Sequence, residues 1–191
     1  MIPKSYYQNP DTLFLAKDLL GKHLCTDFDG QYCVSKIVET EAYIAPEDKG
    51  SHAYQNKRTG RTEIMFHEGG CAYVYLCYGI HSMVNVVSGP KNSAQAILVR
   101  AVEPLINFEK MKTRPGNVCK AMGIHTSDNG ESLYTKGGIW IEEGKEKIEK
   151  SNVVASPRVG IAYAKEWALK NWRFYIKEHP SISKPLLVKY D

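Results

Sequence analysis

The first element that the hydrophobic pattern predicts is a helix near the N-terminus. Its apolar positions are Leu13, Phe14, Leu15, Leu19 and Leu20. This spacing gathers the side chains along one side of a helix. Asn9 or Asp11 can cap its first turn, and Gly21 is a residue typical of the position just after a helix.

Most of the remaining pattern is that of β-strands. Residues 22–28 and 31–43 are rich in β-branched and aromatic side chains, and the Asp29-Gly30 pair between them is a strong hairpin signal. Further strands are predicted at residues 72–78, 82–87, 95–102, 139–142 and 172–177, and further helices at 104–112 and 117–122. This mixture predicts an α+β fold: one domain over residues 1–191, with a curved, mostly antiparallel sheet and flanking helices.

Composition agrees with a globular protein and excludes several other classes. Of the 191 residues, 43% are hydrophobic and 24% are charged, which disfavours a disordered chain, a collagen or a coiled coil. The first nine residues hold no apolar run, and nowhere do about 18 apolar residues follow one another. With a mean hydropathy of -0.37, we expect a soluble intracellular protein that does not enter a membrane.

Five cysteines are present, an odd number with no CxxC pair. They are Cys25, Cys33, Cys71, Cys77 and Cys119. A disulfide framework and a cysteine-rich zinc site are therefore disfavoured, and reduced, buried thiols are expected. We expect no metal site.

Positive charge is concentrated in two places, although the net charge is only +4. The first is a long loop without clear periodicity, residues 44–62, which carries Lys49, Lys57, Arg58 and Arg61. The second holds Lys110, Lys112, Arg114 and Lys120. These clusters could form one phosphate-facing surface, or they could be ordinary solvated charge. A second turn-rich stretch, residues 127–138, suggests no function.

Candidate chemistry begins in the strand before the long loop. Alternation places Glu39, Glu41 and Tyr43 on one face of the strand. A carboxylate partly removed from water can deprotonate a water molecule or stabilise a developing cation on a sugar, as glycosidic cleavage requires. The alternative is a solvated or ion-paired side chain.

Aromatic side chains supply the second candidate. Tyr78 stands beside Gly79 at the end of a strand, where an exposed ring could enter a base step and bend a duplex. His52, Tyr43 and Tyr75 could together sandwich a flat ligand, and the natural flat ligand near basic loops is a nucleobase. Simple packing is the alternative interpretation for each of these rings.

Motifs along nearly the whole chain resemble the alkyladenine (3-methyladenine) DNA glycosylase family. They are Val38-Glu39-Thr40-Glu41-Ala42-Tyr43, Pro46-Glu47-Asp48 with His52, Met65-Phe66, Tyr73-Val74-Tyr75 with Tyr78-Gly79, Asn85, Leu98 to Pro104, Pro115-Gly116, Ser156 to Ile161, and Trp172 to Tyr175. The resemblance implies a monofunctional enzyme that excises alkylated or deaminated purines from double-stranded DNA as the first step of base excision repair. It implies no cofactor and no metal.

The resemblance also implies roles for individual residues. Glu41 corresponds to the general base that activates water, and Tyr78 to the residue that fills the gap left by the flipped nucleotide. Tyr43 corresponds to one wall of the base pocket and His52 with Tyr75 to the other, and Asn85 corresponds to the pocket floor. Arg100 corresponds to a contact with the DNA backbone, and the basic residues Lys57, Arg58, Arg61 and Lys120 are expected to meet phosphates.

Some features leave alternatives open. After Tyr78-Gly79 the family often has Met and an aromatic residue, whereas Ile80-His81 follows here. One alternative function is a non-catalytic nucleic-acid-binding module with the same fold, and another is a hydrolase of free sugars that uses Glu39 and Glu41. We expect a monomer located in the cytoplasm at the nucleoid if the source is bacterial, or in the nucleus if it is eukaryotic.

Overall fold

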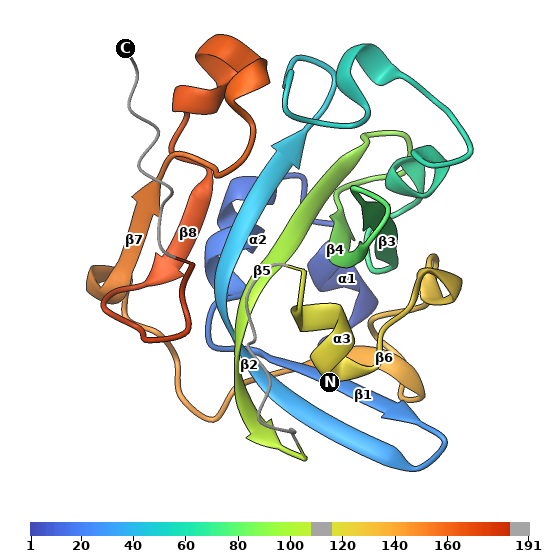
Figure 1. Cartoon of the computed structure of the whole chain (residues 1–191), viewed down its shortest axis with the longest axis vertical. Coiled ribbons are helices and arrows are strands. Elements are labelled where there is room, and N and C mark those ends of the chain that lie inside the picture. The colour runs from blue at the N-terminus through green and yellow to red at the C-terminus, as the bar shows by residue number, and fades with distance from the viewer. Residues whose placement is uncertain (108–115, 184–191) are drawn as a thin grey trace.

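A fourteen-residue strand, β2 (Gln31–Ile44), organises the fold. The computed structural model describes residues 1–107 and 116–183. Strand β2 pairs with β1 (His23–Phe28) across the predicted Asp29-Gly30 turn, and with β5 (Gln95–Ile106) on its other edge. Both turn residues have positive φ, 54° and 80°, as the tight hairpin requires. The long strands β2 and β5 run side by side through the molecule (Figure 1).

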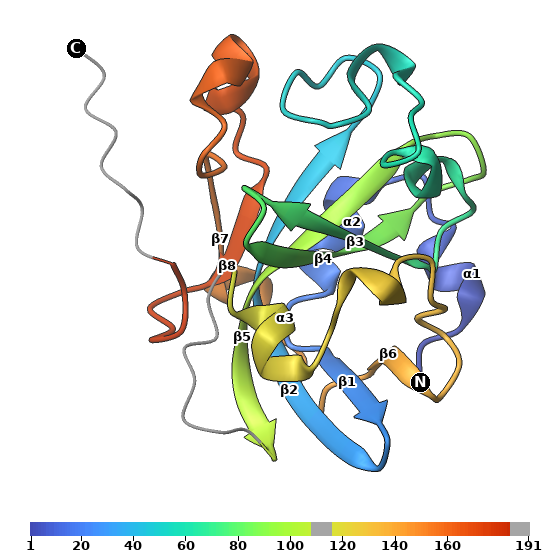
Figure 2. The same ribbon diagram turned by 45° about the vertical axis from the view of Figure 1, so that its right-hand side comes forward.

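All strand pairs of the sheet are antiparallel, as the sequence predicts. The main path of the sheet runs β3-β4-β5-β2-β1-β6, and β8 joins β2 and pairs in turn with β7. The bounds are β3 (Ala72–Cys77), β4 (His81–Ser88), β6 (Gly138–Glu142), β7 (Val153–Ser156) and β8 (Arg173–Ile176). The sheet curls, and the β3–β4 hairpin lies across its upper half (Figure 2). The predicted α+β class with a curved antiparallel sheet is confirmed.

Short helices flank this sheet. They are α1 (Lys4–Tyr7), α2 (Thr12–Asp18) and α3 (Val118–Met122). The Asp11 carboxylate accepts a hydrogen bond from the Phe14 amide and so caps α2, one of the two predicted caps. Figure 2 shows α2 behind the long strands and α3 in front of them. Buried side chains from both helices and the sheet form the main core, including Leu15, Leu19, Ile37, Ile97 and Met122. None of the helices in the two described ranges is long and apolar enough to span a membrane.

A second apolar cluster holds the long loop after β2 in place. It contains Ala53, Ile64, Met65 and Phe66 from the segment that follows β2, packed against Tyr73 of β3 and Val87 of β4. This segment contains two single-turn helices, Tyr54–Asn56 and Glu63–Phe66. Residues 44–62, the loop without clear periodicity, are therefore fixed against the sheet by Ala53 within the loop and by the buried side chains of residues 64–66 directly after it.

Two predictions of the sequence require correction, and one strand was not predicted. The helix predicted at residues 104–112 is wrong over its first part, because β5 continues to Ile106 with Pro104 opposite Ser35. Within residues 1–107 and 116–183 this end of β5 pairs with β2 alone, and a strand with an unpaired edge can accommodate a proline. Residues 108–115 lie outside the described part. Strand β7 was not predicted, and of the five free cysteines only Cys25 and Cys119 are buried.

Candidate functional site

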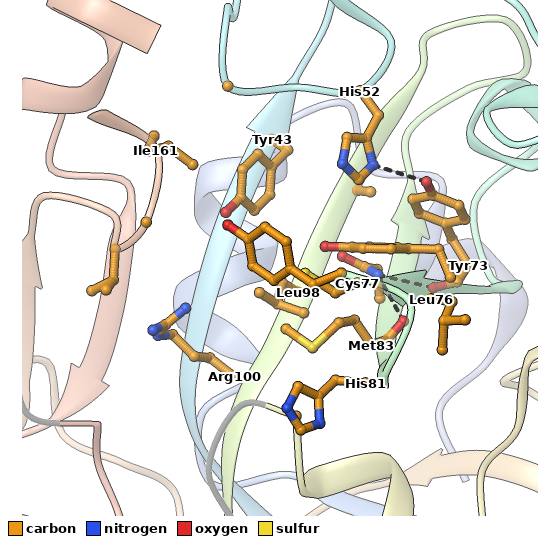
Figure 3. Close-up of a pocket in the computed structure, with 18 of the residues that line it drawn as sticks. Tyr43, His52, Tyr73, Leu76, Cys77, His81, Met83, Leu98, Arg100 and Ile161 are labelled. Carbon is orange, nitrogen blue, oxygen red and sulfur yellow. Dashed lines mark hydrogen bonds between the residues drawn. The ribbon is translucent and has the colours of Figure 1, made fainter. Parts of the chain in front are cut away.

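A cavity of about 590 Å³ opens between β2, the β3–β4 hairpin and the loop after β2. Aromatic and imidazole rings dominate its lining: Tyr43, His52, Tyr73, Tyr75, Tyr78, His81 and Tyr163. Tyr43 lies on one side, and His52 and Tyr73 lie on the other (Figure 3). The volume and the rings suit a flat, mostly apolar ligand held between side chains.

The rings opposite Tyr43 form one connected cluster. The His52 and Tyr75 ring centroids are 4.7 Å apart with planes at 83°, and Tyr75 is tilted against Tyr73 at 5.2 Å. The His52 Nδ1 atom is hydrogen-bonded to the Tyr73 hydroxyl at 2.9 Å. Because His52 and Tyr75 are nearly perpendicular, only one of them can stack face to face with a flat ligand. Their predicted roles as pocket residues stay predictions.

His52 is held in its neutral form. Burial and the neighbouring Arg61 cation lower the pKa of His52 from 6.5 to about 4. The Arg61 guanidinium lies 4.7 Å from the centroid of the Tyr75 ring, and its Nη2 atom lies 3.3 Å from His52 Nε2. An arginine can only donate, so His52 Nε2 accepts and Nδ1 carries the proton toward Tyr73. Arg61 is thus directed at the aromatic cluster.

Glu41 is fully buried directly behind the cavity lining. Its Oε2 atom accepts a hydrogen bond from the Tyr43 hydroxyl at 2.7 Å, and its Oε1 atom accepts one from the Val159 amide at 2.8 Å. Arg100 Nη1 lies 3.4 Å from Oε1. Tyr43, Val159 and Arg100 all line the cavity. The carboxylate is therefore one side chain away from the space that a ligand would occupy.

Tyr43 is a neutral donor to this carboxylate. Burial, followed by the charge of Glu41 and the hydrogen bond to it, raises the pKa of Tyr43 well above 10. The strand alternation that placed Glu41 and Tyr43 on one face explains why the two side chains meet.

Glu39, the other carboxylate of this strand, is also fully buried but faces a different environment. Its oxygens accept hydrogen bonds from Arg173 Nε at 2.6 Å and from the amide and hydroxyl of Ser183 at 2.7 and 2.6 Å. Glu39 does not line the cavity. A pair of free catalytic carboxylates, which the hydrolase of free sugars required, is therefore not formed by Glu39 and Glu41.

A buried ion pair between Asp48 and Arg158 supports the Tyr43 side of the cavity, and the sequence analysis assigned neither residue a role. Both side chains are fully buried, and the guanidinium of Arg158 donates to the two Asp48 oxygens at 2.6 and 2.7 Å. Arg158 also lies 4.7 Å from the centroid of the Tyr43 ring and precedes Val159, whose amide binds Glu41. In the sequence, the only indication that these two residues matter is that each stands in a motif shared with the glycosylase family, Pro46-Glu47-Asp48 and Ser156 to Ile161.

Tyr78 stands at the mouth of the cavity. It occupies the turn between β3 and β4 with a φ of 50°, next to Gly79 with a φ of 72°. Its side chain is 88% exposed, and Leu76 and Ile80 beside it are exposed too. Tyr163, which also lines the cavity, is exposed as well, and sequence reasoning did not find it. The predicted exposure of Tyr78 on a turn is confirmed, whereas its contact with a duplex stays a prediction.

Asn85 lies within the cavity wall on β4. Its Nδ2 atom donates to the Tyr73 carbonyl at 2.9 Å and to the Met83 carbonyl at 3.3 Å, and the residue is only 3% exposed. These two bonds fix the orientation of the amide and leave its oxygen without a hydrogen-bond partner in the described part of the protein. The predicted position at the pocket is thus compatible with the geometry.

The predicted basic surface is only partly assembled. Arg61 and Arg100 reach the cavity, whereas Lys57 is exposed on the loop. Arg58 is paired with Glu63 at 3.3 Å and lies over the Phe66 ring, and Lys49 is paired with Glu166. Lys120 lines a separate hollow beside α3. The rest of the second cluster, Lys110, Lys112 and Arg114, lies outside the described residues.

Comparison with known proteins agrees with this geometry. Residues 5–180 match the profile of the family described as methylpurine-DNA glycosylase (MPG). A relative from Clostridium botulinum is 41% identical over 96% of this chain and 100% of its own length. Relatives from Natranaerobius thermophilus and Chlamydia felis are 40% and 38% identical over 91% and 92% of this chain, and 94% and 96% of their own lengths. The names of these relatives provisionally assign them 3-methyladenine DNA glycosylase activity. The chain belongs to the methylpurine-DNA glycosylase family.

Proposed function

We propose that this protein is a monofunctional DNA glycosylase that acts on damaged purines flipped out of a duplex. The observation that carries the proposal is the position of Glu41, a buried carboxylate directly behind a cavity walled by rings. A base cannot be attacked at its sugar while it is stacked, so it must leave the helix and enter a pocket of this kind. Membership of the family supports the same activity.

Glu41 is the general base in this proposal. A water molecule attacks C1′ of the flipped nucleotide, the bond from C1′ to the base nitrogen breaks, and its electron pair leaves with the base. The water proton passes to a Glu41 oxygen, and the negative charge of Glu41 stabilises the oxocarbenium-like sugar during the step. The bonds from Tyr43 and Val159 hold the carboxylate in place, and Arg100 lies beside it at the cavity.

The rings select the base. Purines alkylated at N3 or N7 carry positive charge, and an electron-rich ring attracts a cation by about 0.5 to 2 kcal/mol. Tyr43 on one side and the His52 and Tyr75 cluster on the other supply such rings, and His52 is itself neutral. Asn85 supplies the polar contact that orients the base within the pocket.

The rim binds the duplex. Tyr78 fills the space that the flipped nucleotide leaves, which its exposure on a turn at the cavity mouth supports. Lys57, Arg58, Arg61 and Arg100 contact phosphates near the cavity, and Lys120, which lines a separate hollow beside α3, contacts a phosphate farther along the duplex. Binding should therefore weaken steeply as salt is added. The protein acts as a monomer and, because the relatives that it resembles come from bacteria, works in the cytoplasm at the nucleoid.

The test compares the wild type with Glu41→Gln on duplexes that contain 3-methyladenine, hypoxanthine or ethenoadenine. Abasic sites are counted after alkaline cleavage, and duplex affinity is measured in parallel. The wild type is expected to release at least one of these bases, and Glu41→Gln is expected to bind the duplex but release none. The control Glu68→Gln removes a surface carboxylate paired with Lys4 and should excise normally.

Two results contradict the proposal. Tight binding of the lesion duplex without release of any base by the wild type supports the non-catalytic binding module instead. Full activity of Glu41→Gln shows that another group activates the water.

A further inference from the structure

The second carboxylate of β2, Glu39, is one of the most completely bonded polar groups in the described part of the protein. Arg173 Nε, Arg100 Nε and the Ser183 hydroxyl all lie within 3.1 Å of its Oε1 atom, and the Ser183 amide donates to its Oε2 atom at 2.7 Å. The side chain has no exposed surface. A carboxylate so fully occupied cannot itself act on a ligand, so its function must lie in what it holds.

Arg100 connects Glu39 to the cavity. Its Nε atom lies 3.1 Å from Glu39 Oε1, while its Nη1 atom lies 3.4 Å from Glu41 Oε1. The register between β2 and β5 passes from Glu39 opposite Ala101 to Thr40 opposite Val99, so Arg100 is left without a partner in the ladder. Such irregularities redirect side chains, and here the redirected guanidinium lies between the two carboxylates.

We propose that Glu39 is a positioning residue for the glycosylase reaction, acting through Arg100; this inference rests on the function proposed above. Glu39 binds the Nε edge of the guanidinium and leaves the Nη edge directed at Glu41 and the cavity. An arginine side chain has four rotatable bonds, so without this anchor its guanidinium would sample positions away from Glu41. Displacement of a catalytic-site group by about 1 Å can lower a rate about 100-fold.

The anchor is completed from the far end of the chain. Ser183 lies 144 residues after Glu39, yet its amide and hydroxyl both donate to this carboxylate. The Ser183 hydroxyl also accepts a hydrogen bond from Arg100 Nε at 3.0 Å, and its carbonyl accepts one from Arg173 Nη2 at 2.8 Å. Two carboxylates and two guanidinium groups therefore meet in one buried cluster whose formal charges cancel. The segment after β8 in this way contributes to the placement of Arg100.

The test is a double-mutant cycle measured under single-turnover conditions with enzyme in excess over lesion duplex. Glu39→Gln is expected to lower the excision rate constant by about 10- to 100-fold and duplex affinity by a much smaller factor, because Arg100 is only one of several phosphate contacts. In an Arg100→Gln background the same substitution should cost no more than about twofold, because the residue through which Glu39 acts is already gone. Glu103→Gln, a carboxylate of the same strand as Arg100 that pairs with Lys36, is the matched control and should excise normally.

If Glu39 only stabilises the fold, the double-mutant cycle gives different excision rates. In that case Glu39→Gln lowers the rate by the same factor in both backgrounds, which overturns the proposal. Ser183→Ala serves if Glu39→Gln does not fold, since it removes only a hydroxyl between Glu39 and Arg100. It should lower the excision rate more than threefold in the wild-type background and less than twofold with Arg100→Gln. Equal effects in the two backgrounds refute the inference. Absence of excision by the wild type refutes the proposed function instead.

Discussion

Removing the hydroxyl group of Tyr43 tests how the fold holds the Glu41 carboxylate in place. Tyr43→Phe deletes the donor that lies 2.7 Å from Glu41 Oε2 but keeps the ring in the cavity wall and over Arg158. The other bond to Glu41, from the Val159 amide, is to Oε1, and Arg100 also approaches Oε1. The substitution therefore leaves Oε2 of a fully buried carboxylate without a hydrogen-bond donor among the described residues.

The size of the effect follows from the type of bond lost. A hydrogen bond to a charged group contributes about 1.5 to 3 kcal/mol. We therefore expect the free energy of unfolding to fall by about that amount in Tyr43→Phe, measured by urea denaturation at pH 7. Each 1.36 kcal/mol corresponds to a factor of ten in rate. If half of the loss appears in the excision step, the single-turnover rate constant falls by about 4- to 13-fold, less than in Glu41→Gln.

The matched control for stability is Tyr75→Phe. Within residues 1–107 and 116–183 the Tyr75 hydroxyl makes no hydrogen bond to protein, so its loss should change the free energy of unfolding by less than about 0.5 kcal/mol. Lesion binding should be retained in Tyr43→Phe because the stacking face is intact. A variant as stable and as fast as the wild type would show that Glu41 does not depend on this hydroxyl. Weaker binding with an unchanged rate would show that the hydroxyl contacts the base instead.

Three further predictions concern the surroundings of the cavity. Asp48→Asn leaves the buried Arg158 without a counter-ion and should lower the free energy of unfolding by about 3 to 5 kcal/mol; a loss below about 1 kcal/mol in urea denaturation contradicts this. Because burial and Arg61 lower the pKa of His52 from 6.5 to about 4, the unfolded chain binds a proton as the pH falls below 6.5 while the folded protein does not. The free energy of unfolding of the wild type should therefore fall more than that of His52→Gln between pH 7 and pH 5. Equal decreases in the two proteins refute a lowered pKa of His52 in the folded state. Tyr78→Ala should weaken binding and excision of a paired lesion without changing stability, because the side chain is 88% exposed. Equal affinities of the variant and the wild type for the lesion duplex in a titration argue against insertion of Tyr78 into the duplex.

Local sequence signals predicted the elements whose cause is local. The Asp29-Gly30 hairpin follows from the positive φ angles that these two residues tolerate, and the cap of α2 follows from the Asp11 side chain. The end of β5 was predicted as a helix because Pro104 suits the first turn of a helix as well as an open strand edge. Pairing with β2 decides between the two, and that pairing is not visible in a short window of sequence.

The same distinction between local and long-range causes applies to the residues of the site. Alternation along one strand was enough to place Glu41 beside Tyr43, and a turn was enough to expose Tyr78. Arg158 lies 110 residues from its partner Asp48, and Ser183 lies 144 residues from Glu39. No periodicity connects residues at such separations, so only the assembled fold could show that they support the candidate site.

The electrostatics of β2 explain why these distant partners are needed. Two carboxylates two residues apart, both removed from water, repel each other and lose hydration, so their burial requires nearby cations and hydrogen-bond donors. Arg173 pairs with Glu39 alone, and Arg100 lies near both carboxylates. Backbone amides and hydroxyl groups donate the remaining hydrogen bonds to each carboxylate. Glu39 thereby takes up most of the positive charge, and Glu41 keeps one weaker arginine contact at 3.4 Å. Glu39 is occupied by a short ion pair and by Ser183, whereas Glu41 is held by two neutral donors and one longer arginine contact next to the cavity, so of the two carboxylates Glu41 is the one placed to orient an attacking water.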